Sequence, residues 1–135
     1  MSKKGKEMDG MIKFTDYGAD GIAVDRRHQA ADLALRRYVP HVIRWHCPRA
    51  GAPISVILPE NLSAREVLSQ AEREKVQLAP AQDPAAPDRV FEIYYAHLAE
   101  TEIEEGIRRL GSCLVRYTQL AARTAPGQPS TLVGT

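Results

Sequence analysis

Four histidines and two cysteines are the side chains in this sequence best suited to bind a transition metal, because imidazole and thiolate are the usual zinc ligands. They are His28, His41, His46, His97, Cys47 and Cys113. His46 and Cys47 are adjacent, so on a strand they would point to opposite faces. Neither Cys-x-x-Cys nor His-x-x-x-His spacing occurs. We therefore expect no metal site and interpret both cysteines as small, unpaired, buried apolar residues.

Covalent catalysis has little support in the sequence. No serine lies in a Gly-x-Ser-x-Gly turn, and the glycines of residues 18–21 lack the three-glycine spacing of a phosphate-binding loop. Lys75 is the only lysine after Lys13, and it lies in a polar run at the end of a predicted helix. A Schiff base would therefore have one badly placed candidate. The glutamates of residues 100–105 are typical of a first helical turn, where the helix dipole favours acids.

The nearly balanced charge of the chain argues against binding to polyanions through its overall electrostatic field. The chain has 135 residues, with 18 Lys+Arg against 17 Asp+Glu, so its formal net charge is +1. No whole-chain field attracts polyanions, and we expect neither a nucleic-acid partner nor a membrane partner. No apolar stretch has the length of a signal peptide core or of a membrane span. A cytoplasmic location is expected.

The chain divides into three parts. Residues 1–23 hold glycines among charged residues, and this predicts a flexible N-terminal arm. Residues 24–123 carry the periodic apolar patterns of one domain. Residues 124–135 contain the proline, glycine and serine of a disordered tail.

Apolar spacing within the domain predicts the element order α-β-β-α-β-β-α. The helices are expected from Asp25 to before Pro40, from a Ser63–Glu66 capping box to about Lys75, and from about Thr101 to the end of the domain. The strands are expected at residues 41–47, 54–58, 76–79 and 90–96. This order indicates an α+β fold with a four-stranded, mostly antiparallel sheet and helices mainly on one face.

From the hairpin onward, these motifs resemble the C-terminal small domain of fold-type-I, pyridoxal-phosphate-dependent aminotransferases. The similarity is to class I/II, including the aminotransferase-like domains of GntR-type regulators. The most specific segment is residues 97–110 (HLAETEIEEGIRRL), which is similar to the family's entry into its final helix. Residues 45–59 (WHCPRAGAPISVILP) resemble the family's hairpin, and residues 63–68 and 76–80 resemble the helix and short strand that follow.

The resemblance also identifies where this sequence departs from the family. It places Glu92 where the family has the arginine that binds the substrate carboxylate, and a carboxylate there repels such a ligand. It assigns Glu92, Tyr94 and Gly51 to the substrate side of the domain. We expect Glu92 either to pair with an arginine of this chain, first of all Arg44 on a neighbouring strand, or to face solvent or a cationic partner. The family's large domain supplies the Schiff-base lysine and most cofactor contacts, so pyridoxal phosphate is implied only for that domain, which this chain lacks.

Two interpretations of function remain open. In the first, the chain is the small domain of a larger or split aminotransferase-like protein or regulator and is not catalytic alone. In the second, it is an independent module that kept the fold, lost the chemistry and binds a protein or small effector. The apolar helix faces predict either a homodimer or a large-domain partner, because large bare apolar patches are rare on monomers.

Overall fold

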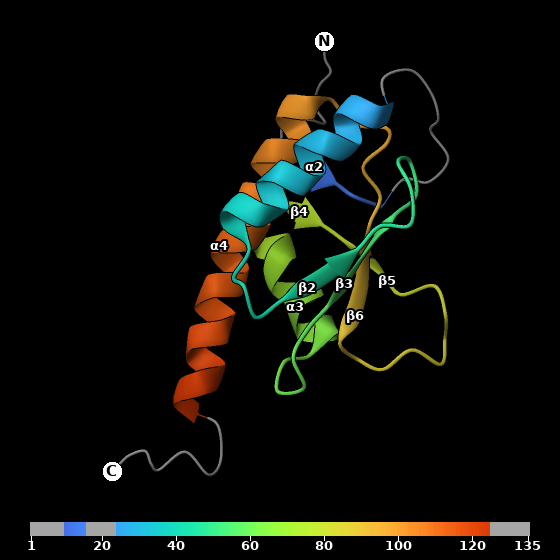
Figure 1. The fold of residues 1–135 in the computed structure, drawn as a ribbon. Coiled ribbons are helices and arrows are strands. Elements are labelled where there is room, and N and C mark those ends of the chain that lie inside the picture. The colour runs from blue at the N-terminus through green and yellow to red at the C-terminus, as the bar shows by residue number, and fades with distance from the viewer. Residues whose placement is uncertain (1–9, 16–23, 125–135) are drawn as a thin grey trace.

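A computed structural model of the chain describes residues 10–15 and 24–124. Three helices account for about half of it: α2 (Val24–Tyr38), α3 (Ala64–Arg73) and α4 (Glu100–Thr124). They lie on one side of a sheet, and α4 is the longest element, extending past the rest of the domain at its C-terminal end (Figure 1). The predicted helices are therefore all present, with ends shifted by one or two residues.

The sheet has four strands in the order β2-β3-β6-β5, and every neighbouring pair is antiparallel. The strands are β2 (Arg44–His46), β3 (Ile54–Ile57), β5 (Ala79–Pro80) and β6 (Val90–Ile93). The hairpin β2–β3 forms one half, and β6 pairs with β3 on one side and β5 on the other. The α+β fold with an antiparallel sheet is confirmed.

The strand expected at residues 76–79 is two strands in two sheets. Ala79–Pro80 forms β5, whereas β4 (Val76–Gln77) pairs in parallel with β1 (Ile12–Lys13) in a separate two-stranded sheet. Ile12 is 8% exposed and Phe14 is completely buried. The interpretation of residues 1–23 as a flexible arm is therefore wrong for this segment, because its two apolar side chains belong to the core. The rest of that arm, and the tail after Thr124, lie outside the described residues.

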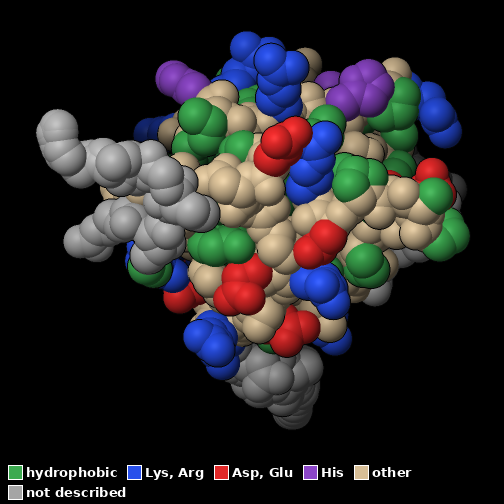
Figure 2. Space-filling model, turned by 90° about the horizontal axis from the view of Figure 1, so that it is seen from below, with side chains coloured by type: hydrophobic (Ala, Val, Ile, Leu, Met, Phe, Trp, Pro, Cys, Tyr) green, Lys and Arg blue, Asp and Glu red, His purple; other side chains and the backbone are tan. Residues whose placement is uncertain are grey.

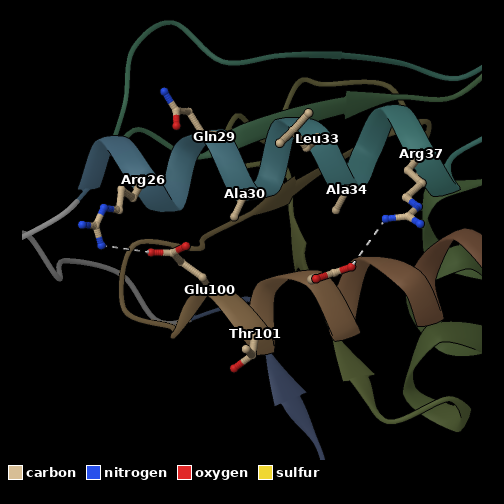
Figure 3. Close-up of a pocket in the computed structure, with 9 residues that line it drawn as sticks. Arg26, Gln29, Ala30, Leu33, Ala34, Arg37, Glu100 and Thr101 are labelled. Atoms are coloured by element: carbon tan, nitrogen blue, oxygen red, sulfur yellow. Dashed lines mark ion pairs between the residues drawn. The ribbon is translucent and has the colours of Figure 1, made fainter.

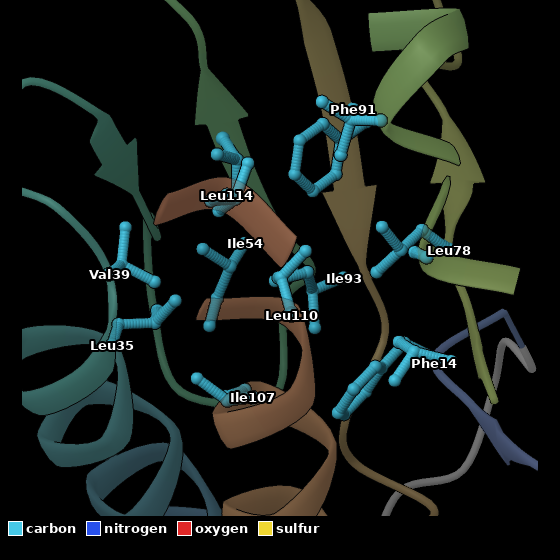
Figure 4. Packing of buried hydrophobic residues seen from close by; sticks show 14 of the residues in the cluster. Phe14, Leu35, Val39, Ile54, Leu78, Phe91, Ile93, Ile107, Leu110 and Leu114 are labelled. Carbon is cyan, nitrogen blue, oxygen red and sulfur yellow. The ribbon is translucent and has the colours of Figure 1, made fainter. Parts of the chain in front are cut away.

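Alternating side chains of the sheet build the core. Ile54 and Val56 of β3 and Phe91 and Ile93 of β6 are at most 1% exposed, whereas the residues that alternate with them inside the two strands are half-buried. The apolar stripe of α4 covers this face: Ile103, Ile107, Leu110 and Leu114. These side chains meet those of α2 and Phe14 in one contiguous cluster (Figure 4). One sheet face is thus covered by helices, and the other faces away from them.

Two glycines let neighbouring segments approach α4 closely. A Cβ on Gly111 would lie 2.7 Å from the Cβ of Tyr38 and closer still to the Tyr38 carbonyl oxygen. A Cβ on Gly106 would lie 2.6 Å from the ring of Phe14. Real Cβ atoms do not approach so closely. Gly111 therefore sets how close α2 packs, and Gly106 makes room for the segment around β1.

The N-terminus of α3 is capped by two segments rather than one. Ser63 Oγ accepts the N–H of Glu66 at 3.3 Å, as the predicted capping box requires. The expected return bond from Ser63 N–H goes to the Tyr117 hydroxyl instead, at 3.2 Å. Asp88, at the end of the proline-rich loop, accepts from Ser63 Oγ at 2.6 Å and from the Arg65 N–H at 3.0 Å. These bonds lower the pKa of Asp88, the Ser63 bond most of all.

Candidate functional site

Glu92 and Tyr94 form a hydrogen-bonded pair on the substrate side that the family resemblance assigned. The Tyr94 hydroxyl donates to Oε1 of Glu92 at 2.9 Å. Glu92 lies opposite Ser55 of β3 and Ala79 of β5, on the sheet face that points away from the helices. Its carboxylate is half-buried, and Tyr94 is 7% exposed. The pair therefore places one oriented negative charge on the open face of the sheet, where it repels carboxylate ligands and favours cationic groups.

The expected ion pair between Glu92 and Arg44 is wrong. Arg44 is aligned with Ile57 on β3, and Ile57 is aligned with Val90 on β6. Arg44 thus lies two strands and two register positions away from Glu92. Within the described part of the chain, no ion pair joins the two side chains. The Glu92 carboxylate instead accepts the hydrogen bond of the Tyr94 hydroxyl.

Gly51 lies in the β2–β3 turn and contacts the neighbour of Tyr94 rather than the Glu92–Tyr94 pair. Its φ angle of 92° is in the region that favours glycine. Its N–H donates to the hydroxyl oxygen of Tyr95 at 2.7 Å. The Cys47 thiol donates to the Arg49 carbonyl at 3.0 Å inside the same turn. Tyr95 therefore fixes the turn onto β6, and the structure does not bring Gly51 into one site with Glu92.

Both tyrosines that follow β6, Tyr94 and Tyr95, are buried. Tyr95 is 1% exposed, and burial raises its pKa to about 12. Its hydroxyl therefore stays protonated at neutral pH and acts as a structural anchor. Catalytic proton transfer by this group would require a pKa much nearer to 7.

The described residues contain no group of three His, Cys, Asp or Glu side chains that could hold a metal ion. Cys113 is buried and Cys47 is half-buried, and both are free thiols. Cys47 is thus less buried than expected. None of the described helices has the length and hydropathy needed to cross a membrane. The face in Figure 2 carries interspersed acidic and basic side chains rather than a field of one sign.

The described residues do not fit pyridoxal phosphate. Of the two lysines in this part of the chain, Lys13 lies exposed on β1 and Lys75 lies exposed in the turn after α3. Helix N-termini often bind phosphate. Those of α3 and α4 are occupied by carboxylates of this chain: Asp88 at α3, and Glu102 at α4, which accepts from the Ala99 N–H at 3.0 Å. Neither lysine therefore has a phosphate cradle beside it.

A groove of about 520 Å³ runs between α2 and α4 (Figure 3). Alanines of α2 form its floor, and exposed ion pairs bridge it: Arg26–Glu100 at 3.9 Å and Arg37–Glu104 at 4.0 Å. Ion pairs as exposed as these contribute little to stability. Because each arginine already has a carboxylate partner, the groove offers no uncompensated charge for a small ligand.

The sequence analysis did not identify Arg109, which holds the segments that lead into β1 and β4. Arg109 donates to Glu105 Oε2 at 2.8 Å, to the Gly10 carbonyl at 2.7 Å and to the Lys75 carbonyl at 3.2 Å. The signal for close packing was present in the sequence. Gly106 and Gly111 interrupt an otherwise strong helical pattern, and a glycine inside such a pattern often marks a close approach of another segment.

Comparison with known proteins connects this fold to one enzyme class. The chain is 35% identical over 89 residues to the 2-aminoadipate transaminase of Thermus thermophilus, a match covering 64% of this chain and 22% of that protein. The crystal structure of LysN, the alpha-aminoadipate aminotransferase of the same organism, matches 73% of this chain and 26% of its own, with 31% identity and a TM-score of 0.68. No protein-family model matches.

More distant structures share the fold. The multiple substrate aminotransferase of Thermococcus profundus has 24% identity and a TM-score of 0.63, covering 71% of this chain and 25% of its own. The kynurenine aminotransferase of Pyrococcus horikoshii has 24% identity and a TM-score of 0.62, covering 69% and 24% respectively. The chain thus spans about a quarter of the length of each relative. Over most of its length the chain is thus similar in sequence and fold to one part of the fold-type-I, pyridoxal-phosphate-dependent aminotransferases.

Proposed function

We propose that this chain acts as the small domain of a larger aminotransferase-like assembly and is not catalytic alone. The rest of the assembly would come from a longer polypeptide or from a separate large-domain chain, as an enzyme or as an amino-acid-responsive regulator. In either case pyridoxal phosphate would be bound by that other part. The unpaired cysteines suit a reducing compartment such as the cytoplasm.

One observation carries this proposal. The match to the aminotransferases covers most of this chain but only 22% to 26% of the relatives named first. In these enzymes the cofactor is held by residues outside the small domain, and the two described lysines of this chain lack a phosphate cradle. The preserved fold together with the poor fit to the cofactor supports a domain that works beside another one.

A stand-alone binding module is the second candidate. The Glu92–Tyr94 pair favours it, because an oriented carboxylate on the open sheet face repels the carboxylate ligands of an aminotransferase. Such a module would bind a protein or effector that presents a cationic group, and it would need no cofactor. A homodimer is an alternative arrangement for both candidates.

The experiment that separates them is affinity capture of the tagged chain from its own cells, followed by borohydride reduction. Mass spectrometry then searches the captured proteins for lysine carrying a reduced pyridoxyl group. We expect this modification on a co-purifying large-domain protein, or on added sequence of a longer form of this chain. The matched control is the purified chain incubated with pyridoxal phosphate, where neither Lys13 nor Lys75 should be specifically labelled.

The outcomes are distinct. A captured protein with a pyridoxyl lysine supports the small-domain function. Capture of partners without such a lysine, together with unlabelled purified chain, would favour the binding module. Stoichiometric labelling of Lys75, abolished in Lys75→Ala, would contradict both, because the chain would then hold the cofactor itself.

A further inference from the structure

Residues 10–15 lie against the rest of the domain as an extended peptide held through its backbone. The N–H groups of Ile12 and Phe14 donate to the carbonyls of Lys75 and Gln77 at 2.9 and 2.8 Å. The Phe14 carbonyl accepts from the Tyr94 N–H at 2.9 Å. Backbone bonding of this kind is how an added strand joins a sheet edge. The edge of β4 therefore acts as the template for β1.

The side chains of this segment alternate between the core and solvent. Ile12 and Phe14 are buried, whereas Lys13 between them is exposed. Figure 4 shows Phe14 among core residues of α4 and the sheet. The missing Cβ of Gly106 makes the space for both, since a Cβ there would lie 2.6 Å from the Phe14 ring and 2.9 Å from the Ile12 side chain. The recognised pattern is apolar, polar, aromatic.

Two further side chains of the domain bind the carbonyls of the segment. Arg109 donates to the Gly10 carbonyl at 2.7 Å. His97 donates from Nε2 to the Lys13 carbonyl at 2.8 Å. Residues of three regions thus form one slot, which we call the strand slot: Lys75 just before β4 and Gln77 in it, Tyr94 and His97 after β6, and Gly106 and Arg109 on α4.

We propose that the strand slot is a strand-acceptor site, which holds residues 10–15 of its own chain and takes those of a second copy when its own strand is displaced. Every group that forms the slot lies outside the segment that fills it. Without β1, the slot presents an unpaired strand edge above an apolar hole, and such edges pair with other chains. A second copy carries the same strand, so exchange reproduces every contact. At low protein concentration the chain's own strand occupies the slot, because its covalent attachment gives it a high effective concentration there.

The first test uses the full chain carrying Phe14→Ala and an acetylated peptide of residues 9–16 (DGMIKFTD). A peptide that binds only the folded slot raises the melting temperature, by about 10 °C at a hundredfold excess over Kd for a domain of this size. We expect this rise in Phe14→Ala and none in the unmutated chain, whose slot is filled. If Phe14→Ala does not fold, Phe14→Leu replaces it.

Peptide variants give the matched controls. Replacing the phenylalanine of the peptide by alanine should weaken binding at least tenfold, whereas replacing its lysine should leave binding within about twofold, because that side chain faces solvent. Absence of any melting shift in the variant, or equal shifts with the phenylalanine and alanine peptides, would overturn the proposal. If an unrelated peptide with the same apolar, polar, aromatic pattern binds more tightly than the peptide of residues 9–16, the occupant would be another protein and not a second copy of this chain.

The second test is complementation between full-length chains. Gly106→Leu fills the slot with its own side chain and keeps an intact strand, whereas Phe14→Ala keeps an intact slot and has a defective strand. Sedimentation of the two variants mixed at equal concentration should show a heterodimer that neither variant forms alone. If the mixture sediments as two monomers while both variants are folded, exchange between copies does not occur.

Discussion

Gly111 shows how one missing side chain positions two helices. The Tyr38 backbone lies where a Cβ would be, and backbone cannot move aside as a side chain can. Alanine is favoured over glycine in a helix by about 1 kcal/mol. Overpacking typically costs about 1–3 kcal/mol, and here α2 must shift. We therefore expect Gly111→Ala to lower the free energy of unfolding by about 1–2 kcal/mol in urea titrations. Ser112→Ala, an exposed neighbour, should raise it slightly, and equal gains in both variants would contradict this packing.

Lys75 gives the opposite expectation, because its backbone rather than its side chain is constrained. It follows α3 with a φ angle of 68°, which costs a residue other than glycine about 1 kcal/mol. Its side chain is exposed, while its carbonyl is bound by the Ile12 N–H and by Arg109. We expect Lys75→Gly to stabilise the chain by about 0.5–1 kcal/mol, measured by urea unfolding. Glu72→Gly, on exposed helix, should destabilise it by about 1 kcal/mol. Destabilisation by both substitutions would show that the lysine side chain contributes to the fold.

Sequence reasoning found the residues of the Glu92–Tyr94 pair but not their partners. Alternation along residues 91–96 places positions 92 and 94 on one face, and the 2.9 Å bond between the two side chains agrees with that. The wrong partner, Arg44, came from assuming a strand neighbour without knowing the register. Strand order β2-β3-β6 inserts a whole strand between them. Register depends on hairpin geometry and long-range pairing, which one strand's sequence does not contain.

Elements with strong periodicity were predictable, and short ones were not. The apolar stripe of α4 extends over many turns, so its helix and its buried face follow from the sequence. β1 has two residues among glycines and charges, and its partner β4 lies more than sixty residues further along the chain. Local propensity contains no information on such a pairing. For the same reason the sequence predicts one strand at residues 76–79, where the structure has β4 and β5.

The carboxylate of Glu105 gives α4 a pH dependence. Hydrogen bonds from Arg108, and then from Arg109, lower its pKa from 4.5 to about 2. The group is ionised more readily in the folded chain, so its contribution is complete above pH 4.5 and is lost as the pH falls toward 2. Because 37% of the side chain is exposed, solvent screening limits the contribution to about 0.5–1 kcal/mol. The unmutated chain should lose this contribution to its unfolding free energy as the pH falls from 4.5 to 2. We expect Glu105→Gln to lose correspondingly less over the same range.

The control for this prediction is Glu72→Gln, an exposed glutamate of α3. Urea titrations of this variant across the same pH range control for the loss of one carboxylate from another helix. Because Arg109 also holds the carbonyls of Gly10 and Lys75, Glu105→Gln should loosen the start of β1 as well. Faster amide hydrogen exchange at Ile12 would report that effect. If the slope of unfolding free energy against pH is the same in Glu105→Gln as in the unmutated chain, the Glu105 carboxylate does not contribute to the pH dependence.

At the scale of the whole molecule, the two sheet faces are unequal. The face toward the helices forms the core, and the opposite face carries half-buried side chains, including Ser55, Ile57, Val90 and Glu92. In the proposed assembly this open face is the one available to the remaining three quarters of an aminotransferase-like protein. In that assembly the carboxylate of Glu92 would act together with side chains of the partner domain.

Glu92→Arg tests whether this chain alone suffices for binding at that face. The substitution removes the hydrogen bond between the Tyr94 hydroxyl and the Glu92 carboxylate, so we expect a loss of about 1 kcal/mol in unfolding free energy. Glu92→Gln keeps an acceptor and should lose less. Calorimetric titration of Glu92→Arg with 2-aminoadipate should show no saturable binding, because one arginine on an open face lacks the enclosure that small-ligand sites need. Saturable binding by the isolated variant would mean that the open face is already a complete substrate pocket, and the need for a second domain would disappear.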